Sequence, residues 1–462
     1  MKYDLAVIGG GPGGYTSAIR AAGLGMKVVL FEKDDLGGVC LNKGCIPTKT
    51  MLKAGNIIAD VGKWQGRGIV CSDIHCDIDE LIAYKNDVIA GLRQGVTSLL
   101  KSSGVTVIKA GAMITGEHTV TANDETFTAE NILVAAGSEP FIPDLPGMDL
   151  PDVVSSDELL EGAFYWELII IGGGNIGMEF ACLYQRLGCK VTVIESKERI
   201  LSAFDPALAE GVRKALEQRG AAIYTSCRVQ RIEEEDGRKV CVYTHNGGEE
   251  RRISAEGVLV AIGRRGCGEK VFVPGLGVEL ANGQIVVDED HRSSLPHIYA
   301  VGDGAKGDIQ LASAAAAYGE SVVYHIAGKS APVDLSVMPI CLFTSPEIAS
   351  AGLTAEEAAS AGINARVVTY PMLCSGRSFA EMVTDGFIRL VCEGAEGKIL
   401  GAQLLGSHAT ELIGELAVCI GKGLTAKDVA SVIHPHPTFC EGVRETAEGV
   451  FGVAVHMAKR RP

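Results

Sequence analysis

Two cysteines five residues apart stand near the N-terminus, in the segment GGVCLNKGCIPTK at residues 37–49. The glycines and the proline around Cys40 and Cys45 allow the bend that a disulfide between the two sulfurs would require. Lys43 and Lys49 are the charged residues of this segment, and cationic neighbours or a helix terminus lower the pKa of a thiol. The residue types and their spacing therefore favour reactive thiols, which are suited to thiol–disulfide exchange.

A second pair of cysteines has the same spacing but different neighbours. Cys71 and Cys76 lie in VCSDIHCDIDE, among four acidic residues that disfavour a thiolate, and no glycine or proline helps the geometry. A metal site built from Cys71, His75, Cys76 and Asp77 is an alternative, but the chain offers no second cluster of ligands. Ordinary surface and core residues are the favoured interpretation of this pair.

A glycine-rich segment occurs twice, since residues 3–33 and 166–196 align without a gap at an offset of 163. Each copy has a short apolar run, a glycine cluster, a segment of helical periodicity and a valine-rich run that ends on an acid. The acids are Glu32 and Glu195, each 23 residues after the first glycine of its copy. The glycines are Gly9, Gly11 and Gly14 in the first copy and Gly172, Gly174 and Gly177 in the second.

This pattern predicts two dinucleotide-binding turns between a strand and a helix. The first glycine makes the tight turn, the second lets the backbone approach a pyrophosphate, and the third lets helix and strand pack closely. The acid accepts a hydrogen bond from a ribose hydroxyl, and Glu195 would repel a 2′-phosphate. The second site should therefore prefer NAD to NADP, although Arg199 lies nearby.

Three further apolar runs end on glycine, which is typical of strands that lead to a cofactor site. They are Asn131–Ser138 with Gly137, Gly257–Arg264 with Gly263, and His297–Asp303 with the pair Gly302 and Asp303. After residue 336 strand-like and helical stretches alternate, which predicts a separate α+β domain. The fold class is therefore α/β with a distinct C-terminal domain.

Composition and charge exclude several functions. The net charge of −15 argues against nucleic acid as a partner. No apolar run of 18 residues and no secretory leader is present, so we expect a cytoplasmic protein with no membrane association. The fourteen cysteines are scattered, and most should be small buried residues of a reduced protein.

Taken together, these motifs resemble those of the class I pyridine nucleotide-disulfide oxidoreductases over essentially the whole chain. The resemblance rests on the two glycine fingerprints, GGVCLNKGCIPTK, Ala-Ala-Gly-Ser at 135–138, Gly-Asp at 302–303 and HPHPTFCEGVRE at 434–445. It implies FAD at the first fingerprint and NAD at the second, with Gly137, Gly263 and Asp303 as further cofactor-binding residues.

The family fold has two Rossmann-like dinucleotide-binding domains and a C-terminal α+β dimerisation domain. For this chain the resemblance implies an FAD-binding domain at 1–147, an NAD-binding domain at 148–270, a return to the central FAD domain at 271–335 and a dimerisation domain at 336–462.

The resemblance also assigns roles around the first cysteine pair. Cys40 and Cys45 would form a redox-active disulfide, with Cys45 against the flavin as the charge-transfer thiolate. Cys40 would be the sulfur that meets the substrate. Lys49 would lie beside the flavin and pair with Glu179, which follows the second fingerprint.

Near the C-terminus the resemblance makes His436 and Glu441 a catalytic dyad that reaches the partner subunit's disulfide, so that the active site requires a homodimer. Residue types support the same histidine, because Pro435 and Pro437 fix the backbone on both sides and Pro437 can open a helix. A carboxylate one helical turn on would orient the ring of a general base. His434 is the competing candidate, and spacing alone does not exclude it.

Within the family the chain is most similar to members that oxidise protein-bound dihydrolipoamide with NAD. This implies a lipoyl domain or lipoylated carrier on a separate chain, as in 2-oxo acid dehydrogenase and glycine cleavage complexes. Ser313 and Ala314 stand where those members usually carry a His-Lys pair, and Arg265, Gly266 and Cys267 replace an Arg-Pro segment.

Those departures leave an NADH-dependent reductase of another small disulfide as an alternative, and a slow-turnover redox-sensing subunit as a remote one. Glutathione-type reductases usually carry arginines for NADP where this chain has Glu195. Mercuric reductases carry a C-terminal vicinal cysteine pair, which is missing after Cys440, and soluble transhydrogenases lack the disulfide.

Overall fold

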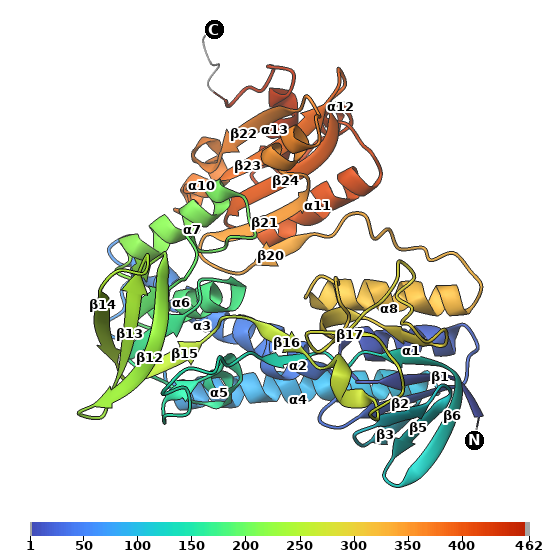
Figure 1. Cartoon of the computed structure of the whole chain (residues 1–462). Coiled ribbons are helices and arrows are strands. Elements are labelled where there is room, and N and C mark those ends of the chain that lie inside the picture. Colours follow the sequence, from blue (N-terminus) through green and yellow to red (C-terminus); the bar gives the residue numbers. More distant parts are fainter. Residues whose placement is uncertain (1, 458–462) are drawn as a thin grey trace. The chain divides into compact units, whose positions relative to one another are not determined.

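The computed structural model describes residues 2–457, which form two compact units (Figure 1). The first unit comprises Met1–Tyr165 and Gly257–Leu335, and the second comprises Trp166–Glu256 and Ser336–Pro462. Among the described residues, no helix combines the length and the apolar character needed to cross a membrane.

The first unit is built on a sheet whose central strands are parallel. In spatial order its strands are β3 (Thr106–Lys109), β2 (Val28–Glu32), β1 (Lys2–Ile8), β6 (Glu125–Val134), β5 (Thr119–Ala122) and β4 (Met113–Gly116), with β19 (Ile298–Ala300) also paired to β6. β5 pairs with the start of β6 in antiparallel register, and β19 runs parallel to its end. Leu5 and Val7 contribute to one apolar core and Ala6 and Ile8 to another, so both faces of β1 are buried. Burial on both faces explains the continuous apolar runs in the sequence.

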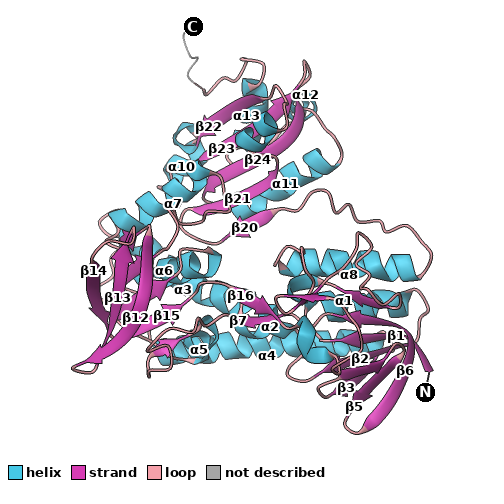
Figure 2. Ribbon diagram, in the orientation of Figure 1, coloured by secondary structure: helices cyan, strands magenta, loops and turns pink. Residues whose placement is uncertain are grey.

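Helices α1 (Pro12–Gly23) and α8 (Ala312–Ile326) lie side by side in this unit (Figure 2). Small residues permit the close approach, because a Cβ on Gly319 would lie 2.1 Å from the Ser17 hydroxyl. The remaining helices are α2 (Gly38–Lys43), α3 (Cys45–Trp64), α4 (Ile78–Ser102) and α5 (Ser156–Glu161). Short elements complete the unit: β7 (Ser138–Pro140) with β16 (Arg264–Gly266), β8 (Val153–Val154) with β15 (Gly257–Val260), β17 (Leu280–Ala281) with β18 (Gln284–Ile285), and the 3-10 turns η1 (Gly268–Val271) and η2 (Gly302–Gly304).

The second unit repeats the strand–helix–strand arrangement of the first. Strands β9 (Glu167–Ile171), β10 (Lys190–Ile194) and β11 (Ala222–Tyr224) are parallel, with α6 (Asn175–Arg186) between the first two and α7 (Pro206–Gln218) before the third. An antiparallel meander of β12 (Cys227–Glu235), β13 (Arg238–His245) and β14 (Glu250–Ala255) follows. The internal repeat therefore corresponds to two copies of one fold, as the sequence predicts.

The C-terminal part of this unit is an antiparallel sheet covered by helices. Its strands, in spatial order, are β20 (Ile340–Leu342), β21 (Glu347–Gly352), β24 (Lys398–Gly406), β23 (Phe387–Glu393) and β22 (Arg366–Pro371). Its helices are α9 (Ala355–Ser360), α10 (Gly376–Ala380) after the 3-10 turn η3 (Met372–Cys374), α11 (Ala409–Gly421), α12 (Ala426–Ser431) and α13 (Glu441–Gly449). Ile413 of α11 and Val443 of α13 share one core with the sheet residues Leu390 and Leu404. The α+β character predicted after residue 336 is confirmed, while the individual domain boundaries stay predictions.

Helix α6 also contacts the segment between β20 and β21. The Phe343 amide donates to Oε1 of the buried Glu179 at 3.0 Å, and Arg186 donates to the Ser345 hydroxyl. The Arg219 guanidinium donates to the Ser345 carbonyl at 2.8 Å. A nearly buried ion pair between Arg389 and Asp205, at 3.2 Å, adds a second connection inside this unit.

Candidate active site

The two cysteines predicted to be reactive lie at a break between two helices. Helix α2 ends at Lys43, Gly44 leaves the helical region (φ −149°, ψ −107°), and α3 begins at Cys45. The break brings Cys40 and Cys45 together, and the hydrogen bond between their sulfurs, with burial added, raises the pKa of Cys40. Cys40 and Cys45 are therefore close enough to interact directly.

Two groups of the same unit act on this pair of sulfurs. Lys49 lies one turn after Cys45 on α3, and its ammonium acts to lower the pKa of Cys40 against the stronger effects of the neighbouring thiol and burial. Tyr15 of α1 is near enough to Cys40 that burial first and the Cys40 sulfur second raise the pKa of its phenol. Tyr15 was not identified from the sequence. The one feature of the sequence that points to it is its position immediately after Gly14, the last glycine of the first fingerprint.

The first glycine turn has the geometry that a pyrophosphate needs. Gly9 has a φ of +101°, which favours glycine, and a Cβ on Gly14 would lie 1.8 Å from the Gly9 carbonyl oxygen. Helix α1 therefore packs directly on the end of β1, with Gly11 as its N-cap. A Cβ on Gly11 would meet nothing closer than 3.6 Å, so the helix N-terminus stays open to a phosphate.

The acid at the end of β2 is tied to this turn. Glu32 is buried and accepts hydrogen bonds from the Gly10 and Asp34 amides, each at 2.7 Å. Each carboxylate oxygen has a second lone pair, so the group can still accept a hydrogen bond from a ribose hydroxyl. The turn, the open helix end and Glu32 together fit the adenosine half of FAD.

The second glycine turn repeats these features. Gly172 has a φ of +110°, and a Cβ on Gly177 would lie 2.0 Å from the Gly172 carbonyl oxygen. Around Gly174 a Cβ would meet no atom within 4 Å, which leaves space for a ligand. Glu195 accepts from the Gly173 and Lys197 amides, each at 2.6 Å. The residues therefore fit a second dinucleotide.

Arg199, which lies near Glu195 in the sequence and could have bound a 2′-phosphate, is hydrogen-bonded to the backbone. Its guanidinium donates to the carbonyls of Ser202 at 3.0 Å and Phe204 at 3.1 Å. The Arg199 side chain therefore braces the loop after β10.

A polar chain connects the strand ends predicted to lie near the first cofactor. Asp303, in η2, accepts a hydrogen bond from the Ser138 hydroxyl at 2.5 Å, and Arg264 donates to the same hydroxyl at 2.8 Å. A Cβ on Gly137 or Gly263 would meet no atom within 4 Å. The structure thus joins Asp303 to the strand end after Gly137, and sequence reasoning had not identified Ser138 or Arg264 as the connecting groups.

The His436 imidazole has the contact expected of the predicted dyad. Its Nδ1 lies 2.8 Å from Glu441 Oε1, while the side chain as a whole is 77% exposed. Glu441 Oε2 accepts from the Thr438 amide at 2.9 Å. Burial alone would raise the pKa of Glu441, but the Thr438 amide and the His436 ring hold it below its ordinary value.

One expectation about this segment was wrong. Pro437 does not open a helix, because α13 begins at Glu441 with Cys440 as its N-cap. Residues 437–440 instead form a turn, in which the Thr438 hydroxyl donates to the Pro435 carbonyl at 2.6 Å. Glu441 is therefore the first residue of the helix, and its carboxylate reaches back to the turn that carries His436.

The structure also distinguishes the two candidate histidines. His434 is only 6% exposed, with Nε2 3.0 Å from Glu415 and Nδ1 3.1 Å from the Val432 carbonyl. Both of its ring nitrogens are engaged, whereas His436 has only Nδ1 in a hydrogen bond that the structure shows. His436 is therefore the more accessible of the two candidate histidines.

The second cysteine pair shows no comparable arrangement. The Cys71 and Cys76 thiols donate to the backbone carbonyls of Asp73 and Asp77, each at 3.7 Å. Within residues 2–457 no group of three or more His, Cys, Asp or Glu side chains is arranged to hold a metal ion.

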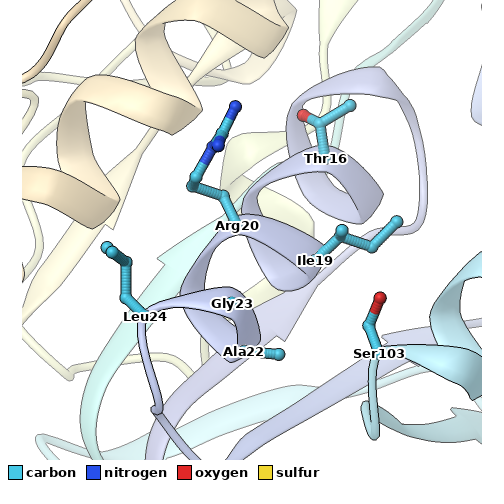
Figure 3. A pocket seen from close by; sticks show the side chains of 7 residues that line it. All are labelled: Thr16, Ile19, Arg20, Ala22, Gly23, Leu24 and Ser103. Carbon is cyan, nitrogen blue, oxygen red and sulfur yellow. The ribbon is translucent and has the colours of Figure 1, made fainter.

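A pocket opens at the C-terminal end of α1, opposite the end that carries the fingerprint (Figure 3). It is lined by Thr16, Ile19, Arg20, Ala22, Gly23, Leu24 and Ser103. Arg20 is engaged with Glu320 at 3.2 Å, and none of the predicted site residues lines the pocket. We therefore assign it no part in the chemistry.

Two family models match most of the chain. Residues 3–319 match the family model of the pyridine nucleotide-disulphide oxidoreductases, and residues 338–447 match that family's dimerisation domain. The chain is 36% identical to a dihydrolipoyl dehydrogenase of Geobacillus stearothermophilus, with 99% of this chain and 98% of that protein covered. It is 38% identical to a dihydrolipoyl dehydrogenase of Haloferax volcanii, with the same coverage.

Two solved structures are similar to this chain over nearly its whole length. LpdA from Mycobacterium tuberculosis has a TM-score of 0.88 at 25% identity, over 97% of this chain and 99% of that chain. The HOCl-induced flavoprotein disulfide reductase RclA from Escherichia coli, solved as a Cu(II) complex, has a TM-score of 0.86 at 26% identity, over 97% and 100% of the two chains. With two dinucleotide turns, an interacting cysteine pair and a dimerisation domain, the chain belongs to the pyridine nucleotide-disulphide oxidoreductases, flavoproteins that bind FAD and a pyridine nucleotide.

Proposed function

We propose that this protein is a dihydrolipoyl dehydrogenase that oxidises protein-bound dihydrolipoamide with NAD. The observation that carries the disulfide chemistry is the contact between Cys40 and Cys45 at the helix break, beside Lys49. Full-length similarity to proteins named dihydrolipoyl dehydrogenase supports the choice of substrate. Glu195, with Arg199 bound to backbone carbonyls, supports NAD.

The exchange begins when His436 takes the proton of a substrate thiol. Its Nδ1 is held by Glu441, which leaves Nε2 to accept the proton and lets the carboxylate stabilise the imidazolium. The substrate thiolate attacks Cys40 of the oxidised pair, the bond between Cys40 and Cys45 breaks, and Cys45 leaves as a thiolate.

The second substrate thiol then attacks the mixed disulfide. Its sulfur forms a bond to the first substrate sulfur, its proton passes to the expelled Cys40 sulfur, and the substrate leaves as a cyclic disulfide. Two electrons now reside on Cys40 and Cys45. Bound FAD and NAD supply the two-electron chemistry that returns the pair to its oxidised form.

Individual residues would hold these cofactors. We assign FAD to Gly9, Gly11, Gly14 and Glu32 with Asp303, and NAD to Gly172, Gly174, Gly177 and Glu195. Gly137 and Gly263 leave open backbone near the cofactors. We also propose that Lys49 and Glu179 pair beside the flavin.

The proposed assembly is a homodimer in which His436 of one subunit serves the cysteine pair of the other. The lipoyl domain or lipoylated carrier belongs to a separate chain. We place the enzyme in the cytoplasm, because a reducing compartment suits fourteen scattered cysteines.

The deciding experiment is NAD reduction by the purified protein with dihydrolipoamide as the donor, with NADP and reduced glutathione in parallel assays. Fast turnover with dihydrolipoamide and NAD alone is the expected result. No turnover, with NADH still reducing bound flavin, would contradict the substrate and favour a reductase of another small disulfide. Little turnover with NADH and an artificial acceptor would instead indicate a redox-sensing subunit.

A further inference from the structure

A buried polar cluster lies behind the turn that carries Asp303. His291 is 8% exposed, and its Nδ1 lies 3.4 Å from Asp308 Oδ1 without a hydrogen-bond partner among the described residues. The Asp308 side chain is 6% exposed. The Tyr318 ring of α8 stacks near the His291 ring, with centroids 4.7 Å apart. The catalytic scheme above uses none of these three residues.

Asp308 is bonded directly to the cofactor turn. Its Oδ2 accepts the Gly302 amide at 2.8 Å, one residue before Asp303. The Asp303 carboxylate itself accepts from the Ser138 hydroxyl at 2.5 Å, so Asp308 holds the backbone before Asp303 and Ser138 holds its side chain. Because a buried amide seldom goes without an acceptor, removing the Asp308 carboxyl would release the turn at Gly302.

Burial shifts the pKa values of both Asp308 and His291 toward their uncharged forms. Burial raises the pKa of Asp308 to about 7, helped by Asp303 and opposed by the Gly302 amide. Burial lowers the pKa of His291, against the influence of Asp288 and Asp290 on its own loop. The Tyr318 hydroxyl faces Asp308 from α8 and accepts from the Ile309 amide.

We propose that Asp308 is a positioning residue for Asp303, and that the buried pair of His291 and Asp308 holds a proton that sets the charge beside the flavin site. The inference rests on the proposed binding of FAD at Asp303. It deepens that function in two ways: Asp308 holds the turn that FAD binding needs, and its proton controls how readily bound FAD is reduced. An ionised Asp308 adds a negative charge, which disfavours the more electron-rich, reduced flavin.

The test compares Asp308→Asn and Asp308→Ala with the wild-type holoenzyme. The FAD dissociation constant is measured by flavin fluorescence, and the midpoint potential of bound flavin is measured from pH 6 to pH 9. Glu289→Gln is the matched control, because Glu289 is exposed on the His291 loop and its loss changes the net charge by the same amount.

The asparagine oxygen can still accept the Gly302 amide, so Asp308→Asn should bind FAD within about twofold of wild type. The midpoint potential of its flavin should lie above that of wild type at pH 8–9. In wild type the potential should fall more steeply with pH near pH 7, where Asp308 ionises, and this steeper fall should be absent from Asp308→Asn. Asp308→Ala should bind FAD roughly tenfold more weakly, as expected for a lost hydrogen bond to a charged acceptor. The control should match wild type in both measurements.

Wild-type potentials in Asp308→Asn across the whole pH range would overturn the charge assignment. Wild-type FAD affinity in Asp308→Ala would overturn the positioning role, and if that variant does not fold, Asp308→Asn still tests the proposal through its potential. A wild-type protein that binds no FAD would overturn the proposed function itself, and this inference with it.

Discussion

At the scale of single residues, Cys40 and Cys45 share a contact but differ in position. Cys45 is the first residue of α3, where the helix dipole favours an anion, and Cys40 lies on the preceding helix near Tyr15. Lys49, one turn on, acts to lower the pKa of Cys40. This asymmetry is consistent with one sulfur that stores charge and one that meets the substrate.

Replacing Cys45 with serine should therefore separate cofactor binding from chemistry. Cys45→Ser should still bind FAD, but should lose dithiol-driven NAD reduction and the long-wavelength charge-transfer absorbance. The measurements are the visible spectrum and the dihydrolipoamide assay. Cys76→Ser is the control, because it makes the same substitution outside the site. Turnover retained by Cys45→Ser would refute the disulfide assignment.

The histidine dyad offers a second residue-scale prediction. Glu441→Gln removes the charge that stabilises the His436 imidazolium, so kcat with dihydrolipoamide should fall by about 10² while FAD binding is kept. The matched control is Glu415→Gln, which removes the equivalent partner of His434 and should change kcat by less than about threefold. Equal losses in both variants would indicate a structural effect instead.

At the scale of elements, the two glycine turns show how a strand and a helix create a binding site by their closeness. In the second turn, α6 lies so near β9 that Gly177 has no room for a side chain, while Gly174 faces open space. The same short segment therefore contains one glycine required by packing and one required by the ligand.

This difference predicts opposite outcomes for two alanine variants. Gly174→Ala, at φ −81°, should fold with wild-type stability but bind NAD at least about tenfold more weakly, because its methyl group fills the ligand space. Gly177→Ala should lose about 1–3 kcal/mol of stability, because its methyl group overlaps the Gly172 carbonyl. Urea unfolding and NAD titration measure the two effects, and tight NAD binding by Gly174→Ala would argue against the assigned site.

The loop after η2 gives a pH-dependent prediction. The pKa of Asp308 is raised to about 7 by burial, above its unfolded value, so its contribution to stability is present at low pH and is lost as the pH rises through about 7. Asp308→Asn has no such titration. Its free energy of unfolding relative to wild type should therefore grow from pH 5 to pH 8, by about 2 kcal/mol after allowance for relaxation of the site. A difference that is independent of pH in urea titrations would contradict this expectation.

At the scale of the whole molecule, the match to a dimerisation domain places the protein in a family of homodimers. If His436 serves the partner's cysteines, each active site needs two chains. Subunit exchange between two inactive variants tests this arrangement directly.

Cys45→Ser and His436→Ala homodimers should each be inactive with dihydrolipoamide. After mixing and exchange, each heterodimer has one site with both lesions and one intact site. Random pairing should restore about a quarter of the wild-type activity. Continued inactivity, with heterodimers verified by mass spectrometry, would place the histidine and the cysteines of one site in the same chain.

The sequence predicted the parts of this protein that are encoded locally. Both fingerprints are continuous segments, so Gly9, Gly14 and Glu32 were identified together with their strand and helix. The cysteine pair was identifiable for the same reason. The start of α13 was mispredicted, because Pro437 favours a helix N-terminus while the Thr438–Glu441 bond that actually shapes the turn depends on a side chain.

Groups that meet only after folding were not identifiable. His291 and Asp308 are 17 residues apart in a region without a periodic pattern, and only the loops around β19 bring them together. His434 and His436 have similar neighbours in sequence. Glu415, which engages one of them, lies on another helix, α11.

The hydrogen bonds between α6 and residues 343–345 affect which segments can be exchanged between related proteins. One helix, α6, begins at the second glycine turn and carries Glu179 and Arg186, which are hydrogen-bonded to Phe343 and Ser345. In a chimera that exchanges only Trp166–Glu256 for the equivalent part of a relative, the new helix would not be matched to Phe343 and Ser345, and these hydrogen bonds would be lost. The unit to exchange is that segment together with β20, β21 and the residues between them, so nucleotide preference and the C-terminal sheet should be inherited together.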